Sequence, residues 1–447
     1  MGKQRMSLWN GSPPRVLVCG FALIILLGTV LLSLPIAVEG EQRLRLIDAF
    51  FTATSATCVT GLVVVDTGTF FTPFGQIVIL GLIQIGGLGF MTMATLFALI
   101  LRKRISFRER LILQEAMNQA TTEGIVRLIR KVVLYTVTIE LAGAVLFTIR
   151  FLFEMPPGQA AYYGVFHAVS LFNNAGFDLM GGFNSLTSYA ADPAVNIVSM
   201  LLIILGGAGF AVLADVMEYR RSKRLSLHSK VVLTTTGLLI AVGAAVIFLF
   251  EFTNPNTLGQ LGWGGKALAS FFQSVTPRTA GANTLPIGEL RQATLFFIII
   301  LMFIGASPGS TGGGIKTTTF ATLVYAVIAM IRGREDIVIF RYRLGQERVF
   351  KALAITMLSL ALVIGVTMIL TATEDQPFLA ILFEATSAFG TVGLSVGLTP
   401  ELTDIGKAII SLTMFAGRLG PLTLAYALGT RTDKEPFRHP EGKITIG

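Results

Sequence analysis

Four short segments of this chain each end in a glycine that follows a small or β-branched residue. The segments read Thr57-Cys58-Val59-Thr60-Gly61, Asn173-Asn174-Ala175-Gly176, Pro277-Arg278-Thr279-Ala280-Gly281 and Gly390-Thr391-Val392-Gly393. A phenylalanine stands ten positions before each glycine, at Phe51, Phe166, Phe271 and Phe383. A pattern that returns four times at long intervals predicts internal repeats, which decide a fold before local propensity does.

These segments offer backbone oxygens rather than acidic side chains. Glycine accepts backbone conformations that other residues avoid, so it lets successive carbonyl groups turn toward one axis. Rings of such carbonyls replace the water shell of a dehydrated alkali cation in selective pores. The nearby side chains are hydroxyl, amide or small apolar groups, and this favours a monovalent over a divalent cation. The competing interpretation is that the glycines are helix caps or close-packing sites in ordinary re-entrant turns.

The composition indicates an integral membrane protein. Of the 447 residues 53% are hydrophobic and 14% are charged, whereas a soluble domain carries about 25% charged residues. Of the 35 Lys and Arg residues, 26 fall in the stretches 1–15, 102–131, 220–230, 332–351 and 431–447. These stretches alternate with acidic ones, which predicts cytoplasmic N and C termini. We therefore expect membrane lipid, and no nucleic acid, as a partner.

The apolar stretches set the expected architecture. A helix needs about 20 residues to cross the hydrocarbon core. Eight stretches qualify: 16–38, 74–101, 127–153, 194–219, 231–252, 292–331, 350–373 and 404–429. Four shorter semi-polar segments lie between the members of each pair, at 45–57, 160–172, 264–276 and 376–388. Re-entrant half-helices fit this description, because irregular backbone at membrane depth must line a cavity or be buried in protein.

We thus predict an all-α polytopic membrane protein in which four pseudo-repeats of helix, pore helix, filter loop and helix surround one pore. One membrane domain covers residues 1–447. Its repeats are 16–101, 127–219, 231–331 and 350–429, and a cytoplasmic tail follows at 430–447.

The sixth apolar stretch is too long to be one helix. The 40 residues of 292–331 would reach about 60 Å as a helix, twice the thickness of the bilayer core. The sequence between the two halves is Gly305-Ala306-Ser307-Pro308-Gly309-Ser310-Thr311-Gly312-Gly313-Gly314. Glycine and proline break helices. We expect a flexible loop inside the membrane in the third repeat.

A second set of glycines lies in the second helix of each repeat. The four motifs are Gly86-Gly87-Leu88-Gly89, Gly206-Gly207-Ala208-Gly209, Gly305-Ala306-Ser307-Pro308-Gly309 and Gly417-Arg418-Leu419-Gly420. Small residues at this spacing permit tight helix packing. Bent helices around a wide inner vestibule are the other interpretation.

Several charged residues fall within or beside predicted membrane segments, where a charge suggests function. We expect Arg418 to face the pore as an electrostatic barrier, or else to pair with a buried acid such as Glu140. Lys316 either acts in the pore or extends its ammonium to the membrane surface. Glu384 either binds cations near the filter or accepts hydrogen bonds from loop amides. We expect Arg278 to point outward into a salt bridge.

At these residues the chain resembles the Trk/Ktr/HKT superfamily of potassium transporters, and especially the bacterial Ktr-type membrane subunit. The resemblance covers almost the whole chain. It rests on one glycine per filter loop, on the motif GASPGSTGGGIKT and on the arginine of GRLGPL, and two extra N-terminal spans typical of Trk-type subunits are not found in the sequence.

The resemblance implies a potassium uptake pore in the bacterial cytoplasmic membrane, with potassium as substrate held by the filter carbonyls. It also implies a homodimer on a cytosolic ring of nucleotide-binding regulatory subunits. Loop 305–314 would be an intramembrane gate that Arg418 faces, and the tail Pro440–Gly447 would insert at the dimer interface. Sodium is a candidate activator.

The sequence therefore predicts a transport protein, not an enzyme, with no cofactor of its own. The alternative is a sodium-coupled or poorly selective secondary transporter of monovalent cations. Such a transporter would show inverted repeats and acidic groups at mid-depth, whereas this chain has four parallel repeats and places Glu140 nearly alone.

Overall fold

The computed structural model describes residues 13–40, 43–89, 92–96, 107–116 and 124–428. Four of its helices are apolar and long enough to cross a membrane. They are α1 (Pro13–Leu32), α7 (Ile125–Phe151), α11 (Leu227–Glu251) and α15 (Gln346–Thr373). Each has many exposed apolar side chains, such as Leu23, Leu141 and Leu238. An apolar surface of this kind suits lipid, and the chain is a multi-pass membrane protein.

A short helix packs against each long one. These helices are α2 (Leu46–Thr57), α8 (Pro157–Phe172), α12 (Trp263–Val275) and α16 (Phe378–Gly390). They coincide with the four predicted half-helices. The contacts join α1 to α2, α7 to α8, α11 to α12 and α15 to α16, and the glycine of each predicted filter loop lies beyond the end of the short helix.

The second helices are shorter than predicted. They are α4 (Pro73–Leu88), α9 (Pro193–Ala208), α13 (Gln292–Ile304) and α17 (Asp404–Leu419). Side chains of Thr72, Asp192 and Thr403 cap three of them by accepting a backbone N–H of the first turn. All four end at a glycine with positive φ: Gly89, Gly209, Gly305 and Gly420.

The spans predicted over 194–219 and 404–429 are each divided into two helices by a sharp bend. After Gly209 the chain continues as α10 (Phe210–Ser222), and after Gly420 as α18 (Pro421–Leu428). The axes of these helices turn by 102° and 93° from those of α9 and α17. Positive φ cannot continue a right-handed helix, so each glycine ends one helix and redirects the chain.

The second glycine set permits tight packing at some positions and bends at others, and the wide inner vestibule stays a prediction. A Cβ on Gly86, Gly206 or Gly417 would lie within 2.0 Å of a carbonyl oxygen at the end of a short helix. These glycines therefore permit tight packing, while Gly209 and Gly420 stand where the chain bends.

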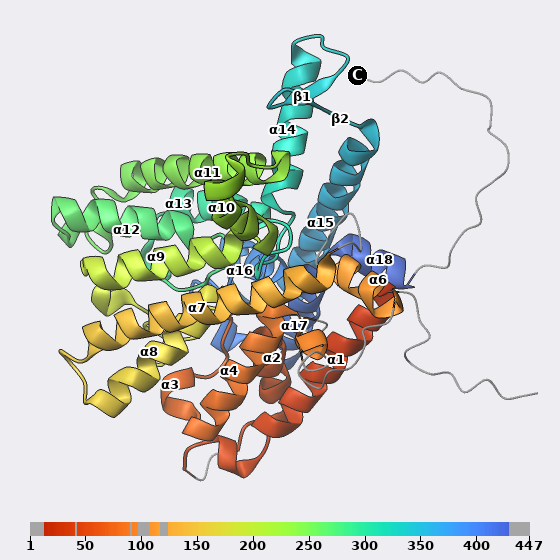
Figure 1. Ribbon diagram of the computed structural model, residues 1–447. Helices are drawn as coiled ribbons and strands as arrows, with labels where there is room; N and C mark the ends of the chain where they lie inside the picture. Colours follow the sequence, from red (N-terminus) through yellow and green to blue (C-terminus); the bar gives the residue numbers. More distant parts are fainter. Residues whose placement is uncertain (1–12, 41–42, 90–91, 97–106, 117–123, 429–447) are drawn as a thin grey trace, which may run out of the picture.

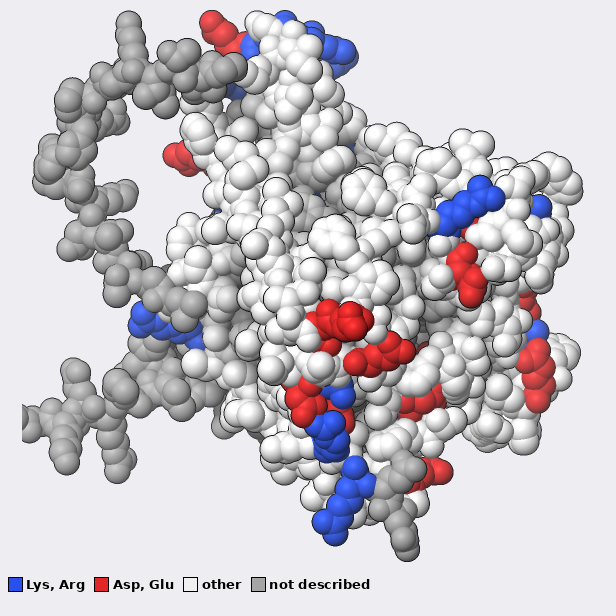
Figure 2. Space-filling view, turned by 180° about the vertical axis from the view of Figure 1, so that it is seen from behind, with Lys and Arg blue, Asp and Glu red and all other residues white. Residues whose placement is uncertain are grey.

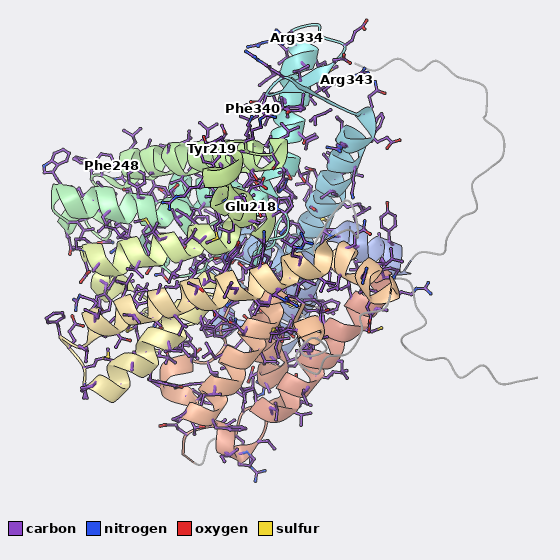
Figure 3. All side chains as sticks on the ribbon, in the orientation of Figure 1. Glu218, Tyr219, Phe248, Arg334, Phe340 and Arg343 are labelled. Atoms are coloured by element: carbon purple, nitrogen blue, oxygen red, sulfur yellow. The ribbon has the colours of Figure 1, made fainter. Side chains whose placement is uncertain are left out.

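The second helix of the third repeat, predicted over 292–331, is broken by a loop as expected. The loop 305–316 separates α13 from α14 (Thr317–Ile331). A hairpin that the sequence analysis did not predict follows, with β1 (Ile337–Ile339) paired antiparallel to β2 (Tyr342–Leu344), Val338 opposite Arg343. The hairpin and the adjoining ends of α14 and α15 project beyond the other helices (Figure 1). Arg334, Phe340 and Arg343 lie at this projection (Figure 3).

The remaining described elements are short. They are α3 (Thr67–Phe70), α6 (Phe107–Ala116), and the 3₁₀ turns Pro35–Ala37, Thr187–Tyr189, Leu258–Gln260, Ile287–Glu289 and Thr399–Glu401. Most of the face in Figure 2 carries no charge, and its charged side chains gather in patches. The predicted tail 430–447 and much of the basic stretch 102–131 lie outside the described residues. The repeat boundaries stay a prediction.

Candidate functional site: a ring of four loops and the loop beside it

The four filter glycines approach one another in a closed cycle. A Cβ on Gly61 would lie 2.3 Å from the carbonyl oxygen of Ala175, and one on Gly176 would lie 2.7 Å from that of Ala280. A Cβ on Gly281 would lie 2.4 Å from the oxygen of Val392, and one on Gly393 would lie 2.1 Å from that of Thr60. The structure thus brings the four predicted loops together in chain order, and at each contact a side chain would collide with backbone.

The backbone within each loop follows one pattern. The residue two positions before each glycine has positive φ: Val59 at 57°, Asn174 at 58°, Thr279 at 73° and Thr391 at 48°. The glycines have positive φ as well, from 69° to 90°. For β-branched residues such as Val59 this conformation is an outlier, and residues held in it cluster at functional sites.

Each short helix holds the loop that follows it. In three repeats the residue before the glycine donates its N–H to the carbonyl of a serine five positions earlier, at 2.8 Å. The serines are Ser55, Ser170 and Ser387. The hydroxyls of Ser55 and Ser387 accept the N–H of Gly61 and Gly393 at 3.1 Å, and that of Ser170 donates to the carbonyl of Phe177.

These serines were not among the predicted site residues. The available signal was a serine six positions before the glycine in three of four loops. Their hydroxyls stabilise a strained backbone by bonding to its own polar groups.

In the third loop, the hydrogen bond that anchors the residue before the glycine spans four positions instead of five. Ala280 donates its N–H to Thr276, four positions back, and the Thr276 hydroxyl donates to the carbonyl of Ala282. The equivalence predicted for Phe271 is therefore wrong. Phe271 is 47% exposed, whereas Phe272 is fully buried like Phe51, Phe166 and Phe383. The shorter closure rotates α12 by one residue, so Phe272 takes the core position.

The glycine-rich loop 305–314 lies directly against the ring. The N–H groups of Ser307 and Thr311 donate to the carbonyls of Gly207 and Gly206 at the end of α9, at 3.1 and 3.3 Å. A Cβ on Gly312 would lie 1.9 Å from the hydroxyl oxygen of Thr279, and one on Gly313 would lie 2.4 Å from that of Thr391. The loop therefore contacts the third and fourth filter loops.

Two cationic side chains hold this loop. The Lys316 ammonium donates to the carbonyls of Gly312 and Gly313, at 2.5 and 3.1 Å, so it does not extend to the membrane surface. The Arg418 guanidinium donates to the carbonyls of Thr311 and Gly86, and to that of Gly87 at 3.1 Å. Arg418 thus joins α17, the loop and the end of α4.

The suggested pairing of Arg418 with Glu140 is wrong. Glu140 accepts hydrogen bonds from the side-chain amides of Gln84, at 3.2 Å, and Asn173, at 2.9 Å. Carbonyl oxygens take the place of a carboxylate at Arg418. These oxygens accept hydrogen bonds from the guanidinium. None of the ion pairs among the described residues includes Arg418.

Comparison with known proteins identifies the family. The family profile TrkH, described as cation transport protein, matches residues 22–432. The chain belongs to the TrkH family of cation transport proteins.

The relatives match over nearly their whole length. "Ktr system potassium uptake protein B" of Bacillus subtilis is 50% identical over 446 residues, which cover 100% of this chain and 99% of the relative. The protein of the same name from Vibrio alginolyticus is 41% identical, covering 98% and 96%. "Potassium/sodium uptake protein NtpJ" of Enterococcus hirae is 39% identical, covering 98% and 97%.

A solved structure has the same fold. The crystal structure of the potassium transporter TrkH from Vibrio parahaemolyticus aligns with a TM-score of 0.69 at 20% identity, covering 96% of this chain and 86% of that one. The predicted helical membrane fold and the family resemblance are thereby confirmed.

Two further charged residues in this TrkH-family chain differ from expectation. Arg278 does not point outward into a salt bridge: it is 5% exposed, and its Nε and Nη1 atoms have no hydrogen-bond partner among the described residues. It lies beside Ile203, Ile204 and Val275, in the seam between α9 and α12. Among the ion pairs of the described residues none includes Arg278.

Glu384 bonds hydroxyls, not loop amides. Its carboxylate is fully buried in α16 and accepts from the hydroxyls of Ser395, at 2.8 Å, and Thr399. Both partners lie in the segment that follows Gly393.

Proposed function

We propose that this chain is the pore-forming subunit of a Ktr-type potassium uptake system. Family membership makes it a cation transport protein, and the relatives that match its whole length carry names of potassium uptake proteins. The four filter glycines carry the proposal, because they close into one cycle with the same strained backbone two positions earlier in every loop.

Selection is performed by the peptide oxygens of the ring. Residues with positive φ and residues with negative φ follow one another within each loop. This change of backbone conformation orients neighbouring carbonyl groups as a uniform β-strand or helix cannot. Potassium leaves its water shell there and exchanges it for these oxygens. The site residues are those of the four predicted loops, from Thr57 to Gly61, Asn173 to Gly176, Thr279 to Gly281 and Thr391 to Gly393.

Gating is performed by the loop 305–314. It contacts filter residues Thr279 and Thr391, and Arg418 and Lys316 hold it through carbonyl oxygens. An arginine at this place also opposes a cation by its charge. Breaking these few bonds frees the loop, so ion passage is controlled without moving the ring.

The assembly proposed is a homodimer bound to a cytosolic ring of nucleotide-binding regulatory subunits, in the bacterial cytoplasmic membrane with both termini in the cytoplasm. The printed name of the Bacillus relative contains the words "Ktr system", which supports an assembly of several subunits. The basic stretches 102–131, 220–230 and 332–351 provide docking surface on the cytoplasmic side.

A second candidate is transport that also uses sodium, as coupling ion or activator. It rests on the 39% identical relative whose printed name includes both potassium and sodium. Potassium uptake measured with and without external sodium separates the two candidates, because only the second predicts a faster uptake with sodium.

Complementation tests the proposal. Wild type should restore growth of a potassium-uptake-deficient bacterium at low potassium, and Gly61→Ser should not, because a side chain at Gly61 would strike Ala175. Gly81→Ser is the matched control, since a Cβ at Gly81 meets nothing within 4 Å. Unchanged growth and ion preference in a correctly inserted Gly61→Ser protein would contradict the proposal.

A further inference from the structure

The segment beyond each filter glycine alternates between buried and accessible side chains. The residue directly after the glycine is buried in all four loops: Leu62, Phe177, Ala282 and Leu394. The next residue is partly exposed in all four: Val63, Asp178, Asn283 and Ser395. Extended backbone sends successive side chains to opposite sides. The second position therefore faces the open side of each loop, directly past the ring.

These four residues stand in the order of the ring. The glycines meet in the sequence Gly61, Gly176, Gly281, Gly393, so Asp178 and Ser395 belong to opposite loops, as do Val63 and Asn283. Three quadrants thus carry an oxygen-bearing side chain and one carries an isopropyl group. Of these four residues, Asp178 carries the one formal negative charge.

The polar atoms leave oxygens available. One carboxylate oxygen of Asp178 accepts the N–H of Met180 at 2.9 Å, and no hydrogen bond among the described residues uses the other. The amide nitrogen of Asn283 donates to the carbonyl of Leu285 at 2.8 Å. Its carbonyl oxygen takes no hydrogen bond from the described residues.

The position of Asn283 is fixed from the neighbouring repeat. Its backbone N–H donates to the hydroxyl of Ser185 at 3.1 Å, and its backbone carbonyl accepts the N–H of Leu186 at 3.0 Å. Two bonds from one short segment hold this residue against the second loop. These bonds fix the backbone of Asn283 relative to the chain that follows the second loop, which carries Asp178.

The hydroxyl of Ser395 is oriented by hydrogen bonds to Glu384 and Gly397. Its proton is donated to Glu384 at 2.8 Å, and its oxygen accepts the N–H of Gly397 at 3.1 Å. A hydroxyl has one donor and two acceptor positions, so one lone pair remains. Glu384 is buried on the protein side of this segment, so the remaining lone pair is free for a ligand on the other side.

We propose that Asp178, Asn283 and Ser395 form a second cation site at the outer mouth, distinct from the carbonyl ring, which takes a partly hydrated monovalent cation before it enters. The proposal rests on the proposed function. One carboxylate with neutral amide and hydroxyl oxygens suits a monovalent ion that keeps part of its water, and the Val63 quadrant leaves room for that water. Glu384 is a positioning residue for Ser395.

Potassium titration of the purified full-length protein by calorimetry tests the site. Asp178→Asn should weaken potassium binding by about tenfold, the scale of one lost charged contact. Ser395→Ala, which keeps the carboxylate, should weaken it by about threefold, the scale of a neutral one. Asp178→Glu should recover part of the affinity, because it restores the charge on a longer side chain.

Asp66→Asn is the matched control. Asp66 also follows a filter loop, but its carboxylate already accepts from the N–H and hydroxyl of Thr69 and from the N–H of Phe183. Its neutralisation should change potassium affinity by less than about twofold, and raised ionic strength should not remove the effect of Asp178→Asn.

Three outcomes decide the proposal. Wild-type affinity in both Asp178→Asn and Ser395→Ala overturns it, and so do equal losses in Asp178→Asn and Asp66→Asn that vanish with salt. A wild-type protein that binds no potassium overturns the proposed function itself. Thermal unfolding of each variant verifies that a loss of binding is not a loss of fold.

Discussion

The filter ring and the glycine-rich loop beside it are both built from glycines with positive φ, yet they are held in different ways. Every filter loop is fixed by hydrogen bonds from the helix directly before it, through Ser55, Ser170, Thr276 or Ser387. The loop 305–314 is held by side chains that follow it, Lys316 and Arg418, and by carbonyls of α9.

The two sets of hydrogen bonds differ in whether their partners lie in the same repeat or in another one. Local bonds within one repeat persist when neighbouring segments shift, so the ring keeps its dimensions. The loop 305–314 is also held from other repeats, by Arg418 and by carbonyls of α9. This contrast supports our proposal that the loop moves while the ring stays in place.

The largest effect is expected from a side chain in the ring. Gly393→Ala places a Cβ 2.1 Å from the oxygen of Thr60 at φ of 90°. We expect potassium uptake to fall by about tenfold or more, because an incompatible Ala at such a position costs more than about 1 kcal/mol. Uptake in potassium-depleted cells measures this change.

Gly397→Ala is the control for that experiment. Gly397 has φ of 99° but meets nothing within 4 Å, so it carries the conformational strain without the collision. Equal losses in both variants would show that strain alone, and not the close approach of four loops, limits the ring.

The next effect concerns the anchor between segments. Arg418→Gln removes the charged bonds to Thr311 and Gly86. Charge-assisted bonds contribute about 1.5–3 kcal/mol each, so the open population and the potassium flux should rise by about tenfold. Flux into proteoliposomes measures it. A fall in flux with unchanged ion selectivity would contradict a barrier role.

A smaller effect is expected from the anchor within the loop. Lys316→Met removes bonds to Gly312 and Gly313, which belong to the same loop. The loop loses stiffness but keeps its tie to Arg418, so flux should rise by about threefold, less than in Arg418→Gln. A larger rise than in Arg418→Gln would reverse the order of the two anchors.

The smallest effect should separate selection from gating. Ser55→Ala removes a hydroxyl that accepts the N–H of Gly61, worth about 1 kcal/mol, and should lower potassium preference over sodium by a few-fold. Ser310→Ala removes a similar hydroxyl from the other loop, where it donates to Ser307. It should change flux and leave ion preference unchanged. Competition between the two ions measures both.

Several features followed from residue order alone. The half-helices, the four loops and the break after α13 were located within a few residues, because length, hydropathy and glycine placement set them locally. The bends at Gly209 and Gly420 were one of two interpretations left open, since a glycine in an apolar helix permits packing or bending and only the surrounding contacts decide.

The partners of buried charges were also beyond the sequence. Arg418 bonds three carbonyls from other segments, Glu384 bonds hydroxyls of its own repeat, and Arg278 lies in an apolar seam. The sequence offered Glu140 as one alternative for Arg418, cations or loop amides for Glu384, and an unnamed salt-bridge partner for Arg278. Charge pairing predicts carboxylates, but within a membrane protein the nearest available acceptors are often backbone oxygens.

The sequence by itself determined that the chain enters a membrane, that four similar loops occur in it, and that a helix breaks in the third quarter. These properties depend on local composition, which can be read directly from the sequence. Only the tertiary structure decided that the loops close into one cycle, that the third is shifted by a residue, and which backbone carbonyls hold each cation. Those properties depend on contacts between segments about a hundred residues apart, which no local pattern encodes.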